Sequence, residues 1–238
     1  MSNLMQILFE RRKTSNDLLS DGVGLVLYSE ESLMLVDFNK AILQLANTPD
    51  SKLLSLLNYD METVFESSIV GTITWKNVQE EDEGGNSFQA AVVATSAAQK
   101  GYGPIMYFIL AEVSKGYIMP DTQISKQALA VWRKFYDNTK VPVRSTSRTP
   151  NWGASNPVSY AYKPRDPSLS IPGLKEEASI GLKDLQEQLQ ERLEALQGKM
   201  DAYQLRDAKE LLTKKGLLAL LRNSASRFFG GQYANRQR

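Results

Sequence analysis

Apolar and polar residues follow two different periods in the first half of the chain. Short alternating or continuous apolar runs are typical of strands, whereas apolar positions three or four residues apart are typical of helices. On this basis we predict strands at residues 23–28, 33–38 and 68–75, one or two helices over 40–58 that break near Pro49, and a helix over 127–137. The succession predicts an α/β (α+β) fold, in which a mixed sheet is flanked by helices.

A strand, a glycine-containing turn and a helix follow one another near the middle of the chain. The apolar run 88–94 predicts a buried strand, and residues 105–113 repeat apolar side chains at helical spacing after Pro104, which suits a first helical position. Glycines in the turn permit backbone conformations and close approach that a β-carbon would block. Because amides at the beginning of a helix favour an anion, the segment is a candidate binding site for a pyrophosphate. The alternative is a strand-to-helix turn that binds no ligand. The residues of this candidate site are Gln99, Lys100, Gly101, Tyr102 and Gly103.

Composition divides the chain into three regions. We predict the α/β domain over residues 1–139, a linker over 140–175 and a helical extension over 176–238. Within the first region, the acidic segment 79–86 is predicted as a solvated loop. The linker contains six prolines, and residues 140–157 are too rich in Pro, Ser, Thr and Asn to predict strands. Basic residues within 138–165 are unaccompanied by any acid, so the linker is either a nucleic-acid or acidic-protein contact or a solvated loop: Lys140, Arg144, Arg148, Lys163 and Arg165.

The C-terminal region has the strongest helical periodicity in the chain. One apolar stripe, beginning near Lys175, predicts a long helix: Leu182, Leu185, Leu189, Leu193, Leu196 and Met200. Its spacing departs from a strict heptad, which favours packing on the chain's own domain or in a short bundle over an extended coiled coil, while self-association through 176–238 stays open. After Thr213 the pattern continues into a basic amphipathic tail without acids. A protein partner needs the fewest assumptions there; a membrane surface and nucleic acid are the alternatives.

Composition excludes several kinds of chemistry. The 238 residues include no cysteine and no histidine, so disulfides, thiolate nucleophiles, Ser-His-Asp triads and His- or Cys-ligated zinc are excluded, and no metal site is expected. Carboxylates, Tyr, Lys and backbone amides remain for catalysis. Because residues 1–12 lack a signal-peptide pattern and no apolar run could span a membrane, we expect a cytoplasmic protein.

Four segments in a fixed order resemble a known family. Ala98-Gln99-Lys100-Gly101-Tyr102-Gly103 is similar to the acyl-CoA-binding Gln/Arg-x-x-Gly-x-Gly/Ala motif of the GNAT superfamily of N-acetyltransferases, although Ala98 replaces the leading Gln/Arg. A second family motif, Asn-x-x-Ala-x-x-Leu-Tyr, aligns with Ser125, Ala128, Val131 and Trp132. With residues 69–75 and 159–162 added, the order resembles the GNAT-like proteins encoded by bacteriophages, over about residues 60–163.

The resemblance implies binding of acetyl-CoA or another acyl-CoA, with its pyrophosphate on the amides around Gln99–Gly103. Family members often use the helix tyrosine as general acid toward the departing thiolate, but that position is Trp132, which has no acidic hydroxyl. Tyr136, one helical turn later, is a candidate for this role, with packing into the core as the alternative. Four carboxylates are candidates for the general base: Glu62, Glu66, Glu112 and Asp121. The alternative for each is a solvated surface residue without a catalytic role.

Two hypotheses follow from these residues. The first is an acyl-CoA-dependent N-acyltransferase of phage origin with an unknown acceptor, which the glycine turn favours. The second is a GNAT-like fold without catalysis that serves as a structural or interaction protein, located in the host cytoplasm or in the virion. The substitutions at Ala98 and Trp132 favour the second hypothesis.

Overall fold

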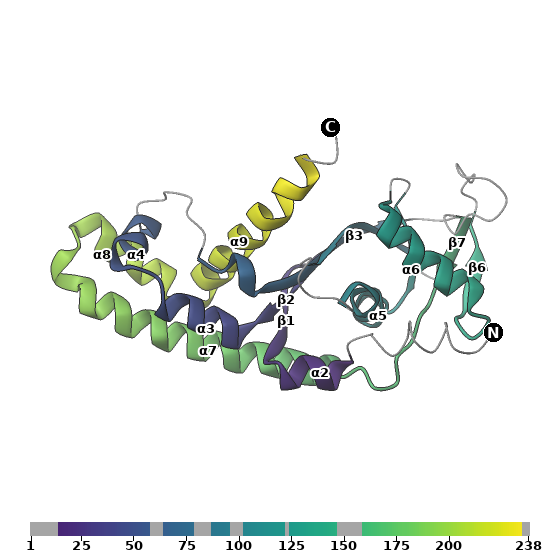
Figure 1. Cartoon of the computed structure of the whole chain (residues 1–238), viewed down its shortest axis with the longest axis horizontal. Helices are drawn as coiled ribbons and strands as arrows, with labels where there is room; N and C mark the ends of the chain where they lie inside the picture. The colour runs from purple at the N-terminus through teal and green to yellow at the C-terminus, as the bar shows by residue number, and fades with distance from the viewer. Residues whose placement is uncertain are drawn as a thin grey trace. The chain divides into compact units, whose positions relative to one another are not determined.

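The structure, a computed structural model of the chain, describes residues 14–57, 64–78, 87–95, 102–121, 124–146 and 159–234. Its strands form one seven-stranded mixed sheet in the order β1-β2-β3-β4-β5-β7-β6. Strands β1, β2, β3, β6 and β7 are labelled in Figure 1. The strands are β1 (Val23–Ser29), β2 (Ser32–Asp37), β3 (Ile69–Val78), β4 (Ser87–Thr95), β5 (Tyr117–Met119), β6 (Val143–Ser145) and β7 (Tyr160–Tyr162). The mixed α/β fold class is therefore as the residue pattern predicts.

The helices are separated by short turns or by strands. They are α2 (Ser15–Ser20), α3 (Phe38–Ala46), α4 (Asp50–Leu56), α5 (Tyr102–Ser114), α6 (Lys126–Asp137), α7 (Ile171–Leu196), α8 (Ala202–Leu211) and α9 (Lys214–Ala234), with short 3-10 turns η1 (Glu66–Ser68) and η3 (Gln197–Lys199). The predicted break near Pro49 is confirmed, since α3 and α4 lie on either side of it, and so is the helix predicted at 127–137. The predicted loop at 79–86 lies outside the described residues.

Local sequence signals explain where several helices begin. The Asp37 carboxylate accepts a hydrogen bond from Lys40 N (2.9 Å) and caps α3 directly after strand β2. The Ser125 hydroxyl accepts one from Ala128 N (3.2 Å) and caps α6, while Asp201 and Gln204 form a reciprocal capping box on α8. Each cap satisfies an amide that has no partner within its helix, so these boundaries are set by short-range chemistry.

Packing divides the chain into two compact units that interleave along the sequence. The first comprises residues 1–17, 29–33 and 71–171, and the second comprises residues 18–28, 34–70 and 172–238. Composition, in contrast, predicted three consecutive regions: 1–139, 140–175 and 176–238. Because compact packing does not test a division by composition, these boundaries stay a prediction.

Aromatic rings form a cluster in the core of the first unit. The Trp132 side chain of α6 is fully buried, and its ring centroid lies 4.6 Å from that of Tyr107 on α5, in an edge-to-face arrangement. Phe135 lies 5.6 Å and Tyr162 lies 5.3 Å from Trp132 between ring centroids. Because Tyr107 is on α5, Trp132 and Phe135 are on α6 and Tyr162 is on β7, the cluster joins these three elements.

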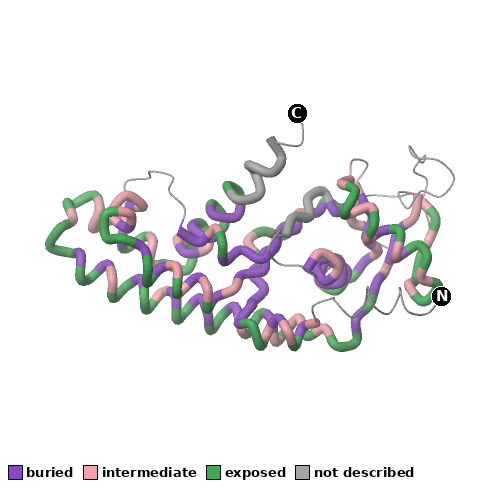
Figure 2. Tube along the Cα trace, in the orientation of Figure 1, coloured by how far each residue is buried: buried purple, intermediate pink, exposed green. Residues whose placement is uncertain are grey.

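The second unit is organised by α7. Its predicted apolar stripe is buried from Leu182 to Leu196, and Figure 2 shows the buried positions recurring along the helix. Two glycines permit close packing here: a β-carbon on Gly24 of β1 would lie 2.5 Å from the Ala178 backbone, and one on Gly181 would lie 2.2 Å from Phe38 Cγ. The burial agrees with a helix that packs on its own domain; self-association through 176–238 stays a prediction.

Two short strands, β6 and β7, form within the segment that composition predicted to be a linker. Val143 of β6 pairs with Tyr162 of β7, and Lys163 N donates a hydrogen bond to Pro142 O (2.9 Å). The expectation of no strand within 140–157 is therefore wrong for residues 143–145. Pro142 precedes β6 and supplies only its carbonyl, so the missing amide of proline does not interrupt the ladder.

Candidate functional site

The candidate site of the glycine turn belongs to a strand–helix–strand unit in the first compact unit. Strands β4 and β5 are parallel neighbours, and α5 provides the crossover between them. Ligands of α/β sheets commonly bind beyond the carboxyl ends of such strands, next to helix N-termini. Of the predicted site residues, Gln99, Lys100 and Gly101 lie outside the described residues, whereas Tyr102 and Gly103 form the beginning of α5.

Strand β4 extends well past the end of its neighbour β5. The β4–β5 ladder pairs Ser87 with Tyr117 and Gln89 with Met119, where β5 ends. On its other side β4 pairs with β3 as far as Thr95. Residues 90–95 therefore form a strand segment beyond the β4–β5 ladder, and the predicted glycine turn follows it in the sequence. A strand segment of this kind can hydrogen-bond to an extended ligand that carries amide groups.

The first turn of α5 combines one buried and one open position. The Tyr102 side chain is 4% exposed and belongs to the core, so only its backbone is suited to a ligand contact. A β-carbon on Gly103 would meet nothing within 4 Å, so space is open on that side of the helix. Pro104 is the third residue of α5 rather than the first, still within the turn whose amides have no helical acceptor.

A carboxylate lies at the point where β4 and β5 stop pairing. Gln89, which is 2% exposed on β4, donates from Nε2 to Asp121 Oδ1 at 2.7 Å, two residues after the end of β5. The amide holds the carboxyl group beside the last paired residues of the two strands. Among the four general-base candidates, Asp121 is the one that the described contacts place next to β4.

The other carboxylate candidates lie elsewhere. Glu112 is on α5 and forms an exposed ion pair with Lys115 at 3.4 Å. Glu66 is in η1, within the second compact unit, and Glu62 lies outside the described residues. No grouping of three or more acidic side chains suited to a metal occurs in the part of the chain that the structure describes.

Trp132, which aligns with the motif tyrosine, and the general-acid candidate Tyr136 have contrasting environments. Trp132 is in the aromatic core, whereas Tyr136 is 39% exposed and its ring centroid lies 5.1 Å from that of Tyr160. A hydrogen bond with Tyr160 raises the pKa of Tyr136 above its ordinary value of 10.0, and the nearby Tyr160 charge adds to this. A higher pKa keeps the hydroxyl protonated near neutral pH but makes it a weaker proton donor.

Two residues of this region were missed in the sequence reasoning. Gln89 stands in the apolar run 88–94, and a lone polar residue within a buried strand is a signal that it needs a partner. Tyr160 belongs to a segment that the sequence analysis noted for its resemblance alone. Its pairing with Tyr136 depends on how β7 packs on α6, which local sequence does not encode.

The described helices include none that is both long enough and apolar enough to cross a membrane. Comparisons of the chain with protein-family models, with curated proteins and with solved structures found no match.

Proposed function

We propose that the chain binds acetyl-CoA or another acyl-CoA at the carboxyl end of β4 and the first turn of α5, and that it transfers the acyl group to an amine. The observation that supports this most directly is the extension of β4 beyond β5 toward the glycine turn. Amides of the pantetheine arm fit the side of β4 that the described part of β5 leaves unpaired after Gln89, and the pyrophosphate fits the amides at the beginning of α5. The GNAT-like resemblance of residues 98–103 adds to this support.

In the proposed reaction the acceptor amine attacks the thioester carbonyl carbon. A C–N bond forms, the C–S bond breaks, and the electron pair of the broken bond leaves with the sulfur as thiolate. Asp121 lies where β4 and β5 stop pairing, and its carboxylate is suited to accept the proton that the amine loses. The thiolate is then protonated by solvent or by Tyr136, and the rate depends mainly on positioning.

A second function is favoured by a specific observation. Trp132 occupies the position where the family often has its acidic tyrosine, and it is fully buried among aromatic rings. A GNAT-like fold that acts as a structural or interaction protein, such as a component of a phage particle, does not need a proton donor there. The two proposals differ in whether acyl-CoA binds.

Thermal unfolding and calorimetry with acetyl-CoA separate the two functions. A ligand that binds only the folded state at about 100 times its Kd adds about 2.7 kcal/mol of stability, so the melting temperature must rise if the proposal is right. No shift and no heat at millimolar acetyl-CoA would remove the acyltransferase proposal. Pantetheine, which lacks the pyrophosphate, is expected to bind more weakly than coenzyme A.

The space at Gly103 allows a sharp variant. Because a β-carbon there meets nothing within 4 Å, Gly103→Trp is expected to fold and to block acetyl-CoA binding. Gly198→Trp is the matched control, since Gly198 has equally open surroundings and lies in η3 of the second unit. Unchanged binding by Gly103→Trp would show that the turn is not the site.

A further inference from the structure

Positive charge is concentrated in the part of the first unit that contains α6, β6 and β7. Residues 124–165 include eight Lys or Arg residues and a single acid, Asp137, whereas the whole chain has a net charge of only +1. All of the described residues in this range belong to the first compact unit. A protein region with such an imbalance creates a positive potential that attracts polyanions.

Two tyrosine rings, exposed Tyr136 and half-buried Tyr160, accompany these cations. Tyr136 near the end of α6 lies beside Tyr160 at the beginning of β7, and Figure 1 shows α6 next to the β6–β7 pair. Arg133 precedes Tyr136 by three residues, so the two lie on neighbouring positions of one helix face. Lys140 follows in the turn to β6, and both cationic side chains are exposed.

Two further cations, Arg144 of β6 and Lys163 directly after β7, lie over the ring of Tyr117 of β5. The Arg144 guanidinium carbon lies 4.7 Å, and Lys163 Nζ lies 5.5 Å, from the centre of the Tyr117 ring. Arg144 also donates a hydrogen bond to the buried Ser87 hydroxyl, and its Nε and Nη1 atoms are buried, so its guanidinium adds to the positive potential without itself facing a ligand. Ring contacts of this kind hold cations in place without neutralising their charge.

The combination fits single-stranded nucleic acid better than an acidic protein segment. A single strand presents a phosphate and an unstacked base with every nucleotide, and the two are bound by cations and aromatic rings respectively. The carboxylates of an acidic segment pair with the cations only, so they leave the Tyr136–Tyr160 pair without a role. The phosphate and base contacts do not require acyl-CoA to be bound.

We propose that the surface formed by Arg133, Tyr136, Lys140, Tyr160 and Lys163, the basic tyrosine surface, binds single-stranded nucleic acid without strong sequence preference. Its phosphates contact the cations, and bases stack on the tyrosine pair. Binding is expected to weaken as salt rises, because each phosphate contact releases counterions.

Fluorescence anisotropy with labelled oligo(dT) and oligo(U) of about 20 nucleotides tests this proposal on the full chain. Arg133→Glu combined with Lys140→Glu is expected to weaken binding at least about tenfold, since both exposed side chains reverse their charge. Tyr136→Leu is expected to weaken it about fivefold or more by removing a stacking ring, while polyglutamate binding would not change. Arg133→Gln with Lys140→Gln provides a milder variant if the reversal prevents folding.

Lys175→Glu with Lys183→Glu is the matched control, because it changes the net charge equally at exposed positions of α7 in the other unit. The proposal is overturned if the oligonucleotides fail to bind at low salt, or if the Arg133–Lys140 variants bind as the parent chain does. It is also overturned if the α7 control or Lys214→Glu with Lys215→Glu in the tail causes the same loss. Stronger binding of polyglutamate with no effect of Tyr136→Leu would assign the surface to an acidic protein instead.

Discussion

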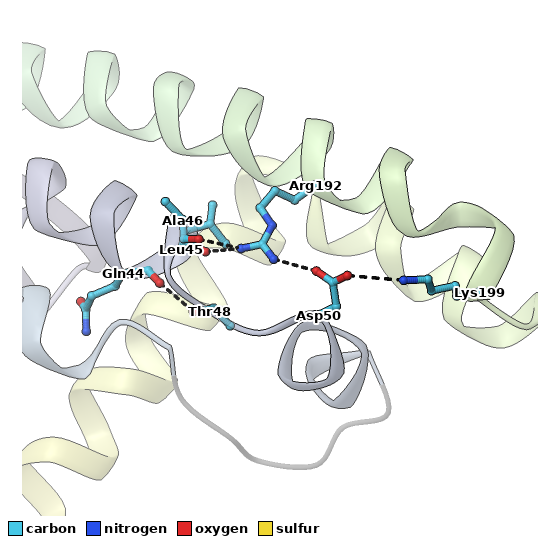
Figure 3. Close-up of polar contacts among 7 residues, drawn as sticks. All are labelled: Gln44, Leu45, Ala46, Thr48, Asp50, Arg192 and Lys199. Atoms are coloured by element: carbon cyan, nitrogen blue, oxygen red, sulfur yellow. Dashed lines mark hydrogen bonds and ion pairs between the residues drawn. The ribbon is translucent and has the colours of Figure 1, made fainter.

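Arg192 Nη2 of α7 lies 2.9 Å from Asp50 Oδ1 at the beginning of α4 (Figure 3). The same guanidinium donates from Nη1 to Leu45 O at 2.5 Å and to Ala46 O at 3.3 Å, at the end of α3. One cation thus satisfies carbonyls at a helix C-terminus and a carboxylate at the next helix N-terminus, the placement that both helix dipoles favour. Lys199 Nζ lies 3.5 Å from the other oxygen of Asp50.

Arg192→Met is expected to lower the free energy of unfolding at neutral pH and to change its dependence on acid. The hydrogen bond from Arg192 lowers the pKa of Asp50, with a smaller contribution from Lys199. A carboxyl group with a lowered pKa stabilises the fold above its unfolded pKa, and this contribution is lost as pH falls through the folded pKa. Urea denaturation at a series of acidic pH values measures this effect. As pH falls, the free energy of unfolding should decrease less in the variant than in the parent chain.

A double-mutant cycle with Asp50→Asn separates the ion pair from the carbonyl contacts of Arg192. The exposed pair Lys183–Glu187 on α7 provides the control cycle, for which we expect little coupling. Equal coupling in both cycles would contradict a special role for Arg192.

Gly24→Ala is expected to destabilise the second unit by about 1–3 kcal/mol, the usual range for overpacking. Its β-carbon would lie 2.5 Å from the Ala178 backbone, which cannot move without shifting α7. Gly198→Ala is the control, since its β-carbon meets nothing and the change stiffens the unfolded chain. Chemical denaturation of the two variants should give opposite or clearly unequal changes in the free energy of unfolding. Equal free energies of unfolding would show that β1 and α7 are not in close contact.

Tyr162→Phe is expected to make the first unit more resistant to alkali. Burial raises the pKa of Tyr162 far above the ordinary 10.0, and the neighbouring Tyr136 and Tyr160 charges act in the same direction. A raised folded pKa means that stability is fully present below pH 10 and is lost as pH rises, because the unfolded tyrosine ionises first. Melting temperatures between about pH 8 and pH 11 measure the effect.

The phenylalanine variant retains the ring contacts with Trp132 and Phe135, so its stability near neutral pH should be close to that of the parent chain. If the melting temperatures of both proteins fell equally at alkaline pH, ionisation of Tyr162 would not be the cause of the alkaline loss of stability.

Asp121→Asn tests the proposed base within the proposed reaction. The asparagine still accepts the hydrogen bond of Gln89 through its carbonyl oxygen but cannot take a proton from an amine. If the chain is an acyltransferase, release of free thiol from acetyl-CoA with an amine acceptor should fall by about 10²–10⁴. Acetyl-CoA affinity, measured by calorimetry, should not change.

Glu112→Gln is the matched control, since Glu112 forms an exposed ion pair with Lys115. Equal losses in the two variants, or a loss of affinity in Asp121→Asn, would assign Asp121 a different role.

Most local elements could be predicted from the residue pattern because their causes lie within a few residues. The break near Pro49 reflects the constraint of proline, and Ser125 marks the beginning of α6 with its own side chain. The apolar period of α7 required no knowledge of its partners. The short β6 was not predicted, because its ladder is made with β7, fifteen residues or more away in the chain.

The sequence by itself determined the mixed α/β class, the succession from β4 to α5 and the absence of histidine and cysteine chemistry. Tertiary structure alone decided that Asp121 lies beside Gln89, that Tyr136 meets Tyr160 and that Arg192 reaches Asp50. These contacts join residues distant in the chain, and their geometry follows from the packing of strands and helices. A local pattern predicts which face of an element is buried, but not which side chain of another element lies against it.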